Sequence, residues 1–170
     1  MFPFTGRAVA AALLLAFGSA GAAMAQGATT EALLKDSKLD YKVIKPGLYR
    51  IVLETQEGIS TIGVEEVKLP WKDSKGNEQF YAQIFTVVAA APADFKASTA
   101  MLGRLAELND GIRFGSVGMS KEKDAVRFYR NSSMFLRNAG ADQLADMIVV
   151  MHYDKFRLQK ELKGFIDEGK

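Results

Sequence analysis

Apolar and polar residues alternate with a period of two along residues 41–55, which is the pattern of half-buried β-strands. Tyr49 and Ile51 share one face of this stretch. Pro46 and Gly47, in its middle, are typical turn residues. The stretch is therefore predicted to be either a strand pair or one bent strand.

Two further strands are predicted before the second helix. The alternation in residues 59–70 changes phase at Glu65 and Glu66, which indicates a β-bulge. A polar loop follows at 71–79. Residues 80–92 are apolar on both faces, so this strand is central in the sheet, or a helix or a partner covers its second face.

Helical spacing of apolar residues marks three other segments. Residues 29–39 predict a short helix that Thr29 or its neighbour caps, and residues 94–110 predict a longer one with Asp94 as its candidate cap. The longest helix is predicted over 140–169. Its apolar residues recur at spacings of three and four or their multiples: Leu144, Ile148, Met151, Leu158, Leu162 and Phe165.

Between the second and third helices, residues 112–120 and 125–131 flank a charged turn and predict a β-hairpin. Strands thus come in sequential groups joined by short turns, which favours an antiparallel sheet with helices packed on it. The predicted fold class is α+β, with a mainly antiparallel sheet of about five strands in the order α-β-β-β-α-β-β-α. We find no internal repeat and no long linker, so residues 26–170 are predicted to form one domain.

Three glycines, Gly111, Gly115 and Gly118, lie where the second helix joins the hairpin. A phosphate-binding loop needs a strand before its glycines and a helix after them, so that backbone N–H groups meet the anion. Here a helix precedes the glycines and a strand follows them. We expect Gly111 to end the helix in the left-handed region, and the other two to mark a bulge or a close approach.

The first 25 residues differ in composition from the rest. Arg7 and no acid precede an uninterrupted apolar run at 8–17, and small residues then end in Ala23-Met24-Ala25. This is the pattern of a secretory signal peptide cleaved after Ala25, with a retained membrane anchor as the alternative. The mature protein is therefore predicted to be periplasmic or secreted.

The chain has 22 basic and 20 acidic side chains that are interspersed, so no nucleic-acid partner is expected. It has no cysteine, so an exported domain depends on its core and not on disulfides. His152 is the single histidine, and a zinc site would have to be built mostly from carboxylates. We therefore expect no metal and no cofactor.

Other candidate chemistry has simpler explanations. Residues 73–78 lack the twelve-residue register and flanking helices of an EF-hand calcium site. Ser132 and Ser133 lack the G-x-S-x-G elbow of a nucleophile, and one histidine alone could serve them as a base. Glu65 and Glu66 are strand neighbours that face opposite sides unless the bulge rotates one of them. The chain is predicted not to be an enzyme.

Apolar residues that could meet a partner are the remaining candidates. Residues 144–153 are apolar almost all round, so they are either wedged between the sheet and another helix or form a dimer or client-binding surface made adaptable by methionine. Trp71, alone in the polar loop, either closes the core edge or contacts a partner. The candidate interaction residues are Trp71, Tyr81, Phe85, Met147, Met151 and Tyr153.

The join LAELNDGIRFGSVGMSKEKDAVRFYRN and the helix start GADQLADMI resemble the YbjN family of bacterial sensory-transduction-regulator-like proteins. The resemblance covers about residues 30–166 and rests on a helix ending Leu-x-x-Leu-Asn, a strand Ile-x-Phe-Gly and an apolar strand with Arg and an aromatic. It implies a curved antiparallel sheet with helices on it, as in type III secretion chaperones, which are commonly homodimers that hold an extended segment of another protein. The signal peptide and the long loop LPWKDSKGNEQ depart from the usual cytoplasmic member.

These observations favour a non-enzymatic, exported protein-binding or chaperone-like domain with an unknown protein client. It would act as a monomer or a homodimer, with no membrane partner after signal cleavage. The alternative is a periplasmic small-ligand-binding protein or hydrolase with a pocket between the sheet and the C-terminal helix. A third hypothesis is a structural or envelope-stress accessory protein without a discrete ligand.

Overall fold

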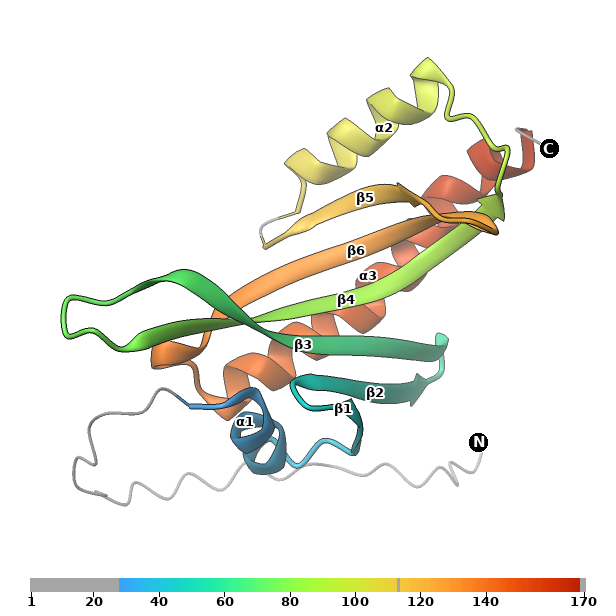
Figure 1. Cartoon of the computed structure of the whole chain (residues 1–170). Coiled ribbons are helices and arrows are strands. Elements are labelled where there is room, and N and C mark those ends of the chain that lie inside the picture. The colour runs from blue at the N-terminus through green and yellow to red at the C-terminus, as the bar shows by residue number, and fades with distance from the viewer. Residues whose placement is uncertain (1–27, 113, 169–170) are drawn as a thin grey trace, which may run out of the picture.

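The computed structural model describes residues 28–112 and 114–168. These residues form an open six-stranded sheet, three α-helices and one short 3-10 helix (Figure 1). The predicted signal peptide and its cleavage site lie outside the described residues. The elements in chain order are α1 (Thr30–Asp36), β1 (Tyr41–Lys45), β2 (Leu48–Thr55), β3 (Gly58–Lys72), β4 (Glu78–Pro92), α2 (Thr99–Asp110), β5 (Ser116–Lys121), β6 (Ala125–Phe135), η1 (Leu136–Asn138) and α3 (Ala141–Glu168).

The strands lie in the order β1-β2-β3-β4-β6-β5, and every neighbouring pair is antiparallel. The predicted α+β class and antiparallel sheet are confirmed, but the sheet has six strands and not about five. The difference arises because residues 41–55 are a strand pair. Gly47 adopts a φ of 76° in the turn that separates β1 from β2, a conformation open mainly to glycine.

The register of β3 shows that the predicted bulge is wrong. Glu65 and Glu66 both pair with β4 in unbroken register. The irregularity lies further on, between Lys68 and Lys72, and includes Pro70, which has no N–H to donate to a ladder. The phase change in the sequence has a different cause, because the apolar residues that follow the glutamates lie on the opposite face of the sheet.

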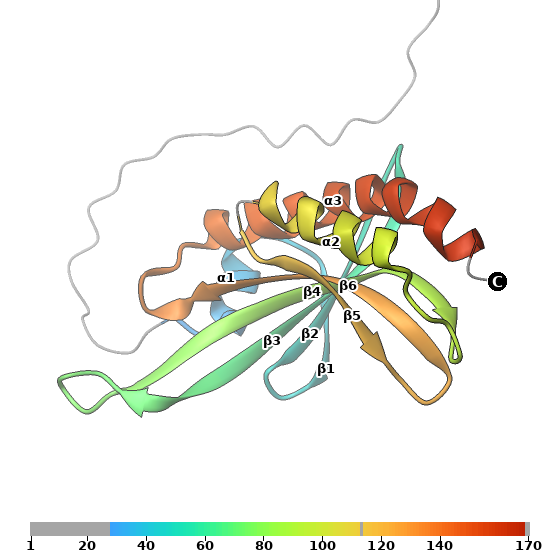
Figure 2. The ribbon, with the colours of Figure 1, turned by 90° about the horizontal axis from the view of Figure 1, so that it is seen from above.

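All three α-helices lie on one face of the sheet, and no described element covers the other (Figure 2). We call these the helix face and the outer face. α3 runs along the helix face, with α1 beside its N-terminal half, and Arg104 of α2 contacts Glu161 in its C-terminal half at 2.7 Å. The strands fan out around the middle of the sheet, which gives it a pronounced twist.

Two clusters of buried side chains lie between α3 and the sheet. The first joins α1, β2, β3, β4 and η1, and the second joins β4, α2, β5 and β6. α3 contributes to both and carries the polar residues His152 and Asp154 between the two. Its buried stripe agrees with the predicted one except that Ile166 is more deeply buried than Phe165: Leu144, Ile148, Met151, Leu158, Leu162 and Ile166.

α2 begins later than predicted and ends where predicted, but the residue that follows it has another conformation than expected. Ser98 caps the helix by accepting a hydrogen bond from the Met101 N–H at 3.2 Å, while Asp94 lies in the preceding turn. Gly111 has a φ of −82°, so the predicted left-handed helix end is wrong. The left-handed residue comes later, at Gly115, whose φ is 89°.

Candidate functional site

The outer face of the sheet is the first candidate site, because no helix covers it (Figure 2). Successive residues of a strand point to opposite faces, so every second residue of β3, β4 and β6 reaches this face. Cross-strand pairing arranges these side chains in rows: Val67 beside Tyr81 and Phe135, Gln83 beside Ser133, and Phe85 beside Asn131. Aromatic, aliphatic, amide and hydroxyl groups therefore share one continuous surface.

Phe85 covers a glycine of the neighbouring strand. It pairs directly with Gly63, and a Cβ at residue 63 would overlap the Phe85 ring. The missing side chain lets the ring lie close to the backbone of β3, so Phe85 is half-buried. The Phe85 ring is thereby held against the backbone of β3.

An open pocket of about 300 Å³ lies on the same face. This volume is at the lower end of the range found for small-ligand sites. The side chains of its amides and hydroxyls can both donate and accept hydrogen bonds without carrying charge. The pocket is lined by Leu69, Tyr81, Gln83, Asn131, Ser132, Ser133 and Phe135.

Two of the six predicted interaction residues lie on this face. Tyr81 and Phe85 are half-buried there, with the row of Gln83 and Ser133 between them. Trp71 is 55% exposed near the end of β3, in the hairpin that extends beyond the rest of the sheet (Figure 1). The structure thus brings the two β4 residues together and leaves Trp71 further along the hairpin.

The other three predicted residues lie on α3, on the opposite side of the sheet. Tyr153 is 52% exposed. Met147 packs against the first core cluster, and Met151 is only 1% exposed. Met151 is therefore a core residue, which corrects its expected place on an interaction surface: α3 turns this side toward the sheet. Segment 144–153 is wedged against the sheet and α1 as the first alternative supposed, and its outward side remains exposed.

Sequence reasoning missed four residues of the outer face: Gln83, Asn131, Ser133 and Phe135. The last strand was predicted to end at residue 131, whereas β6 continues to Phe135. Three of them could have been found from the alternation that persists through NSSMF, because its first, third and fifth residues share a face, and Gln83 alternates with Tyr81 and Phe85 in the predicted strand.

A second candidate site is buried beneath α3. His152 Nδ1 lies 2.6 Å from Ser60 Oγ, and its Nε2 lies 2.8 Å from Thr55 Oγ1. In either neutral tautomer of His152, both ring nitrogens have a hydrogen-bonding partner, because each hydroxyl can donate or accept. A serine beside a histidine can act as a nucleophile, but Ser60 is completely buried and no substrate can reach it as the chain is folded here. The contacts instead tie α3 to the β2–β3 hairpin.

The environment of His152 favours its neutral form. Burial lowers the pKa of His152, and the charge of Lys155 lowers it further, while Glu57 raises it. Burial also lowers the pKa of Lys155, whose Nζ donates a hydrogen bond to the Ile59 carbonyl at 2.9 Å. The imidazole is therefore uncharged at neutral pH.

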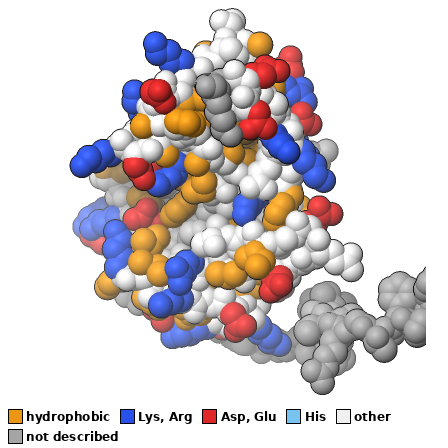
Figure 3. Space-filling model, turned by 90° about the vertical axis from the view of Figure 1, so that its right-hand side faces the viewer, with side chains coloured by type: hydrophobic (Ala, Val, Ile, Leu, Met, Phe, Trp, Pro, Cys, Tyr) orange, Lys and Arg blue, Asp and Glu red, His pale blue; other side chains and the backbone are white. Residues whose placement is uncertain are grey.

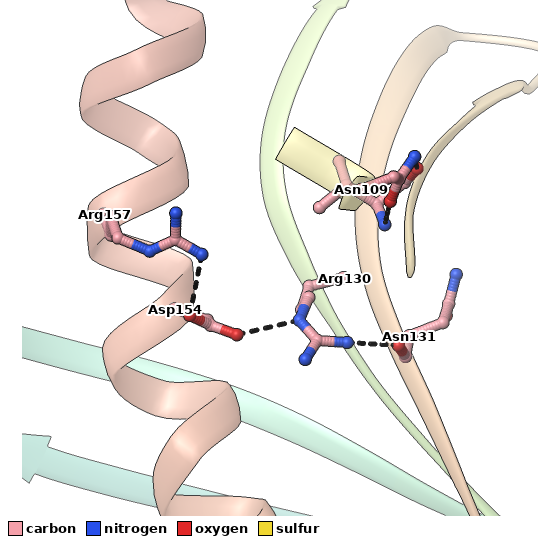
Figure 4. Close-up of polar contacts among 6 residues, drawn as sticks. Asn109, Arg130, Asn131, Asp154 and Arg157 are labelled. Carbon is pink, nitrogen blue, oxygen red and sulfur yellow. Dashed lines mark hydrogen bonds and ion pairs between the residues drawn. The ribbon is translucent and has the colours of Figure 1, made fainter. Parts of the chain in front are cut away.

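Arg130 carries a buried charge between β6 and α3 (Figure 4). Its Nε donates to Asp154 at 2.9 Å, and its Nη1 donates to the Asn131 carbonyl. The other Asp154 oxygen accepts a hydrogen bond from Arg157 at 3.0 Å. Gly115 packs closely here, because a Cβ would overlap the same Asn131 carbonyl. Paired in this way, the guanidinium has a structural role at the junction of the two core clusters.

Asn109, at the end of α2, binds the free edge of β5. Its side-chain amide donates to the Val117 carbonyl at 3.0 Å and accepts from the Val117 N–H at 2.6 Å (Figure 4). The amide thereby occupies the place of a further strand at this point of the edge. It is the asparagine of the Leu-x-x-Leu-Asn motif.

A second hollow, of about 370 Å³, lies between the β2–β3 turn and α3. Its place is closest to the pocket between the sheet and the C-terminal helix that the alternative small-ligand function would use. A ligand there would have to displace existing ion pairs. On the side of the molecule shown in Figure 3, both signs of charge are intermixed with apolar side chains. The paired groups around the hollow are Arg157 with Asp154, Lys160 with Glu57, and Glu161 with Arg104.

Across residues 28–112 and 114–168, no group of three or more His, Cys, Asp or Glu side chains is placed to hold a metal ion. None of the helices in this part of the chain has the length and apolar character of a membrane span. No family model, curated protein or solved structure matches the chain.

Proposed function

We propose that the protein is a non-enzymatic binding domain that holds an extended, largely uncharged segment of another protein against the outer face of its sheet. The observation that carries this proposal is the set of half-buried aromatic side chains and neutral amides on β4 and β6 that no helix covers. Apolar patches rimmed by polar groups mark protein contacts, and aromatic residues are enriched in them. Tyr81 and Phe85 are the central residues of the contact.

The charge of the face restricts the client. Glu65 is charged at its margin and lies 3.9 Å from Lys45, whereas the rows through β4 and β6 carry amides and hydroxyls. A charged residue of the client could pair with Arg50 of β2, which lies in the row of Phe85, but against the amides and hydroxyls of β4 and β6 it would lose hydration without an ionic partner. An extended segment with alternating apolar and polar residues fits better. Its apolar side chains can contact Tyr81 and Phe85 while the amides bond its backbone.

The resemblance noted in the sequence supports the same function. We further infer a YbjN-like domain with a fold of the type III secretion chaperone type, in which helices pack on one face of a twisted antiparallel sheet. The predicted signal peptide at 1–25 supports export, so the client would be a secreted or envelope protein. Sequencing the N-terminus of the purified mature protein tests this step, with Gln26 expected as its first residue.

Site-specific photo-crosslinking in the source cell tests the binding function. A photoreactive phenylalanine analogue placed at Tyr81 should give a discrete protein adduct. The matched control places the same analogue at Leu102, which is half exposed on α2. Equal labelling at both positions, or no adduct at Tyr81, would contradict the proposal.

A charge placed in the pocket gives a second test. Gln83→Lys keeps both central aromatic residues, and we expect it to weaken client capture by about tenfold or more, because a buried unpaired charge opposes association. Leu102→Lys, at a half-exposed position of α2 on the helix face of the sheet, is the control. Thermal unfolding of both variants should match that of the parent protein, which separates lost binding from lost folding.

A further inference from the structure

Arg50 of β2 reaches the outer face of the sheet without an acidic partner. Its neighbours Tyr49 and Ile51 are buried on the helix face, so the alternation of the strand turns Arg50 to the opposite side, where it is exposed. It is the one arginine in residues 28–112 and 114–168 that forms no ion pair. The others each pair with a carboxylate: Arg104, Arg127, Arg130, Arg137 and Arg157.

Cross-strand pairing places Arg50 in the same row as an aromatic ring. Arg50 pairs with Gly63, and Gly63 pairs with Phe85. Because the Phe85 ring lies over Gly63, only one strand spacing, about 5 Å, separates the strand beneath the ring from the strand of Arg50. On the other side Arg50 pairs with Lys42 of β1, which is exposed too. An apolar ring and two cations are therefore neighbours in one row.

The acidic residues of the same face do not neutralise Arg50. Glu65, two residues beyond Gly63 on β3, lies 3.9 Å from Lys45. Glu54 is four residues further along β2, which is about 13 Å at the rise of a strand. The guanidinium is therefore available to a carboxylate of another molecule.

We propose that Arg50 binds an acidic side chain of the client, and that this acid lies two residues from the apolar residue that contacts Phe85. The inference rests on the proposed function and names the chemistry of the client segment. Alternate residues of an extended chain point to the same side and are about 7 Å apart, so one covers the ring while the next but one reaches the guanidinium. Arginine then forms two parallel hydrogen bonds to the carboxylate.

The same row discriminates between clients. A basic residue at this position of the client meets the charges of Arg50 and Lys42, which oppose its approach. An amide there gains no ionic partner. The client is therefore uncharged where it lies on β4 and β6 and acidic where it reaches β2.

Replacement of Arg50 tests the inference through the photo-crosslinking of the client at Tyr81. We expect Arg50→Gln to lower the yield of the adduct by about threefold to tenfold, and Arg50→Glu to lower it further. Arg50→Lys keeps the charge but loses the planar fork, so its yield should be intermediate. The matched control is Lys163→Gln, which removes one exposed positive charge from α3, on the helix face.

The outcomes separate this inference from the proposed function. If the parent protein gives no adduct at Tyr81, the binding function itself is wrong. If the parent gives an adduct whose yield Arg50→Gln leaves unchanged, the binding function stands and the role of Arg50 is overturned. Thermal unfolding of each variant should match that of the parent protein, because the side chain of Arg50 is exposed and makes no ion pair.

A synthetic peptide of the crosslinked client segment identifies the acid. Both ends of the peptide are blocked, so that only side-chain carboxylates carry negative charge, and fluorescence anisotropy measures its affinity. Changing the acid to its amide should weaken binding to the parent protein by about as much as Arg50→Gln does, and should have little further effect on Arg50→Gln. Added salt should weaken binding to the parent protein more than binding to Arg50→Gln.

A charge exchange gives the most specific measurement. A peptide with lysine in place of the acid should bind the parent protein poorly and recover affinity for Arg50→Glu, because the opposite charges face each other again. An acid whose removal weakens the parent and Arg50→Gln equally would overturn the inference. So would a client that binds Arg50 only through its free C-terminal carboxylate, or a segment that has no acidic residue.

Discussion

Gly115 combines two constraints at one residue. Its φ of 89° lies in the left-handed region, and a Cβ would overlap the Asn131 carbonyl oxygen of the neighbouring strand. The overlap is with backbone, so no side-chain rotation can relieve it. The glycine therefore sets how closely the start of β5 approaches β6 and the buried guanidinium of Arg130.

Gly115→Ala should lower the free energy of unfolding by about 2–4 kcal/mol, from backbone strain together with the displaced strand. Gly118 is the matched control, because nothing lies within 4 Å of its missing Cβ. Gly118→Ala should be neutral or stabilise the protein by about 0.5–1 kcal/mol, since alanine is favoured over glycine inside a strand. Urea denaturation measures both, and equal effects would contradict the packing described for Gly115.

His152 should make the protein less stable in mild acid. Its pKa in the folded state is lowered by burial first, so the unfolded chain binds the proton more readily. The histidine contributes no such penalty above its unfolded pKa of about 6.5, and stability falls as the pH drops from there toward the folded pKa. The slope from this one group is at most about 1.4 kcal/mol per pH unit.

Urea midpoints between about pH 5 and pH 7.5 measure this dependence. His152→Asn is the comparison variant. It should be less stable at neutral pH, because it cannot bridge Ser60 and Thr55 together, but its stability should change less across the window. If the urea midpoints of the two proteins changed with pH in the same way, His152 would be excluded as the source of the acid sensitivity.

At the scale of elements, Asn109 links a helix to a sheet edge. Asn109→Ala removes both side-chain bonds to Val117, and we expect a loss of about 1–2 kcal/mol in unfolding free energy. Hydrogen exchange of the Val117 amide should become faster. Asn109→Asp keeps the acceptor and loses the donor, so its effect should be intermediate. Unchanged protection of Val117 in the alanine variant would contradict the role assigned to this amide.

The elements could be predicted wherever one period persists over many residues. α3 is the clearest case, because buried apolar residues recur at helical spacing from Leu144 to Leu162, with one missing turn between Met151 and Leu158. The sequence around Pro46 and Gly47 could not distinguish a strand pair from one bent strand, since both show the same alternation on the two sides of a turn. The predicted bulge at Glu65 failed because a phase change also arises when a strand carries apolar residues on its second face.

Site residues are harder to predict, because periodicity reports which residues are apolar and not what covers them. Tyr81 and Phe85 were found because their strand is apolar on both faces. Met151 was misplaced for the same reason: in a helix apolar almost all round, only the fold shows which side meets the sheet. The role of Asn109 could not be predicted from the sequence, because its partner is the backbone of Val117 in another element.

For the whole molecule, α3 and β4 are the elements that contribute to both core clusters. The side chain of Ile148 belongs to the first cluster and that of Leu158 to the second, on one continuous helix. We therefore expect the domain to unfold in a single transition. Far-UV circular dichroism and the fluorescence of Trp71 should report the same urea midpoint.

Shortening a buried α3 side chain in either core cluster should destabilise the whole domain. Ile148→Ala and Leu158→Ala should each cost about 2–5 kcal/mol, and each should move both signals together. Separate midpoints for the two probes in either variant would show instead that the halves unfold independently.

The contact between Gly63 and Phe85 also restricts how the sequence can diverge. Any side chain at 63 would push the Phe85 ring off β3, while a smaller residue at 85 would leave the glycine backbone uncovered. Among descendants of this sequence we expect the two positions to be inherited as a pair, with a residue larger than glycine at 63 accompanied by one smaller than phenylalanine at 85.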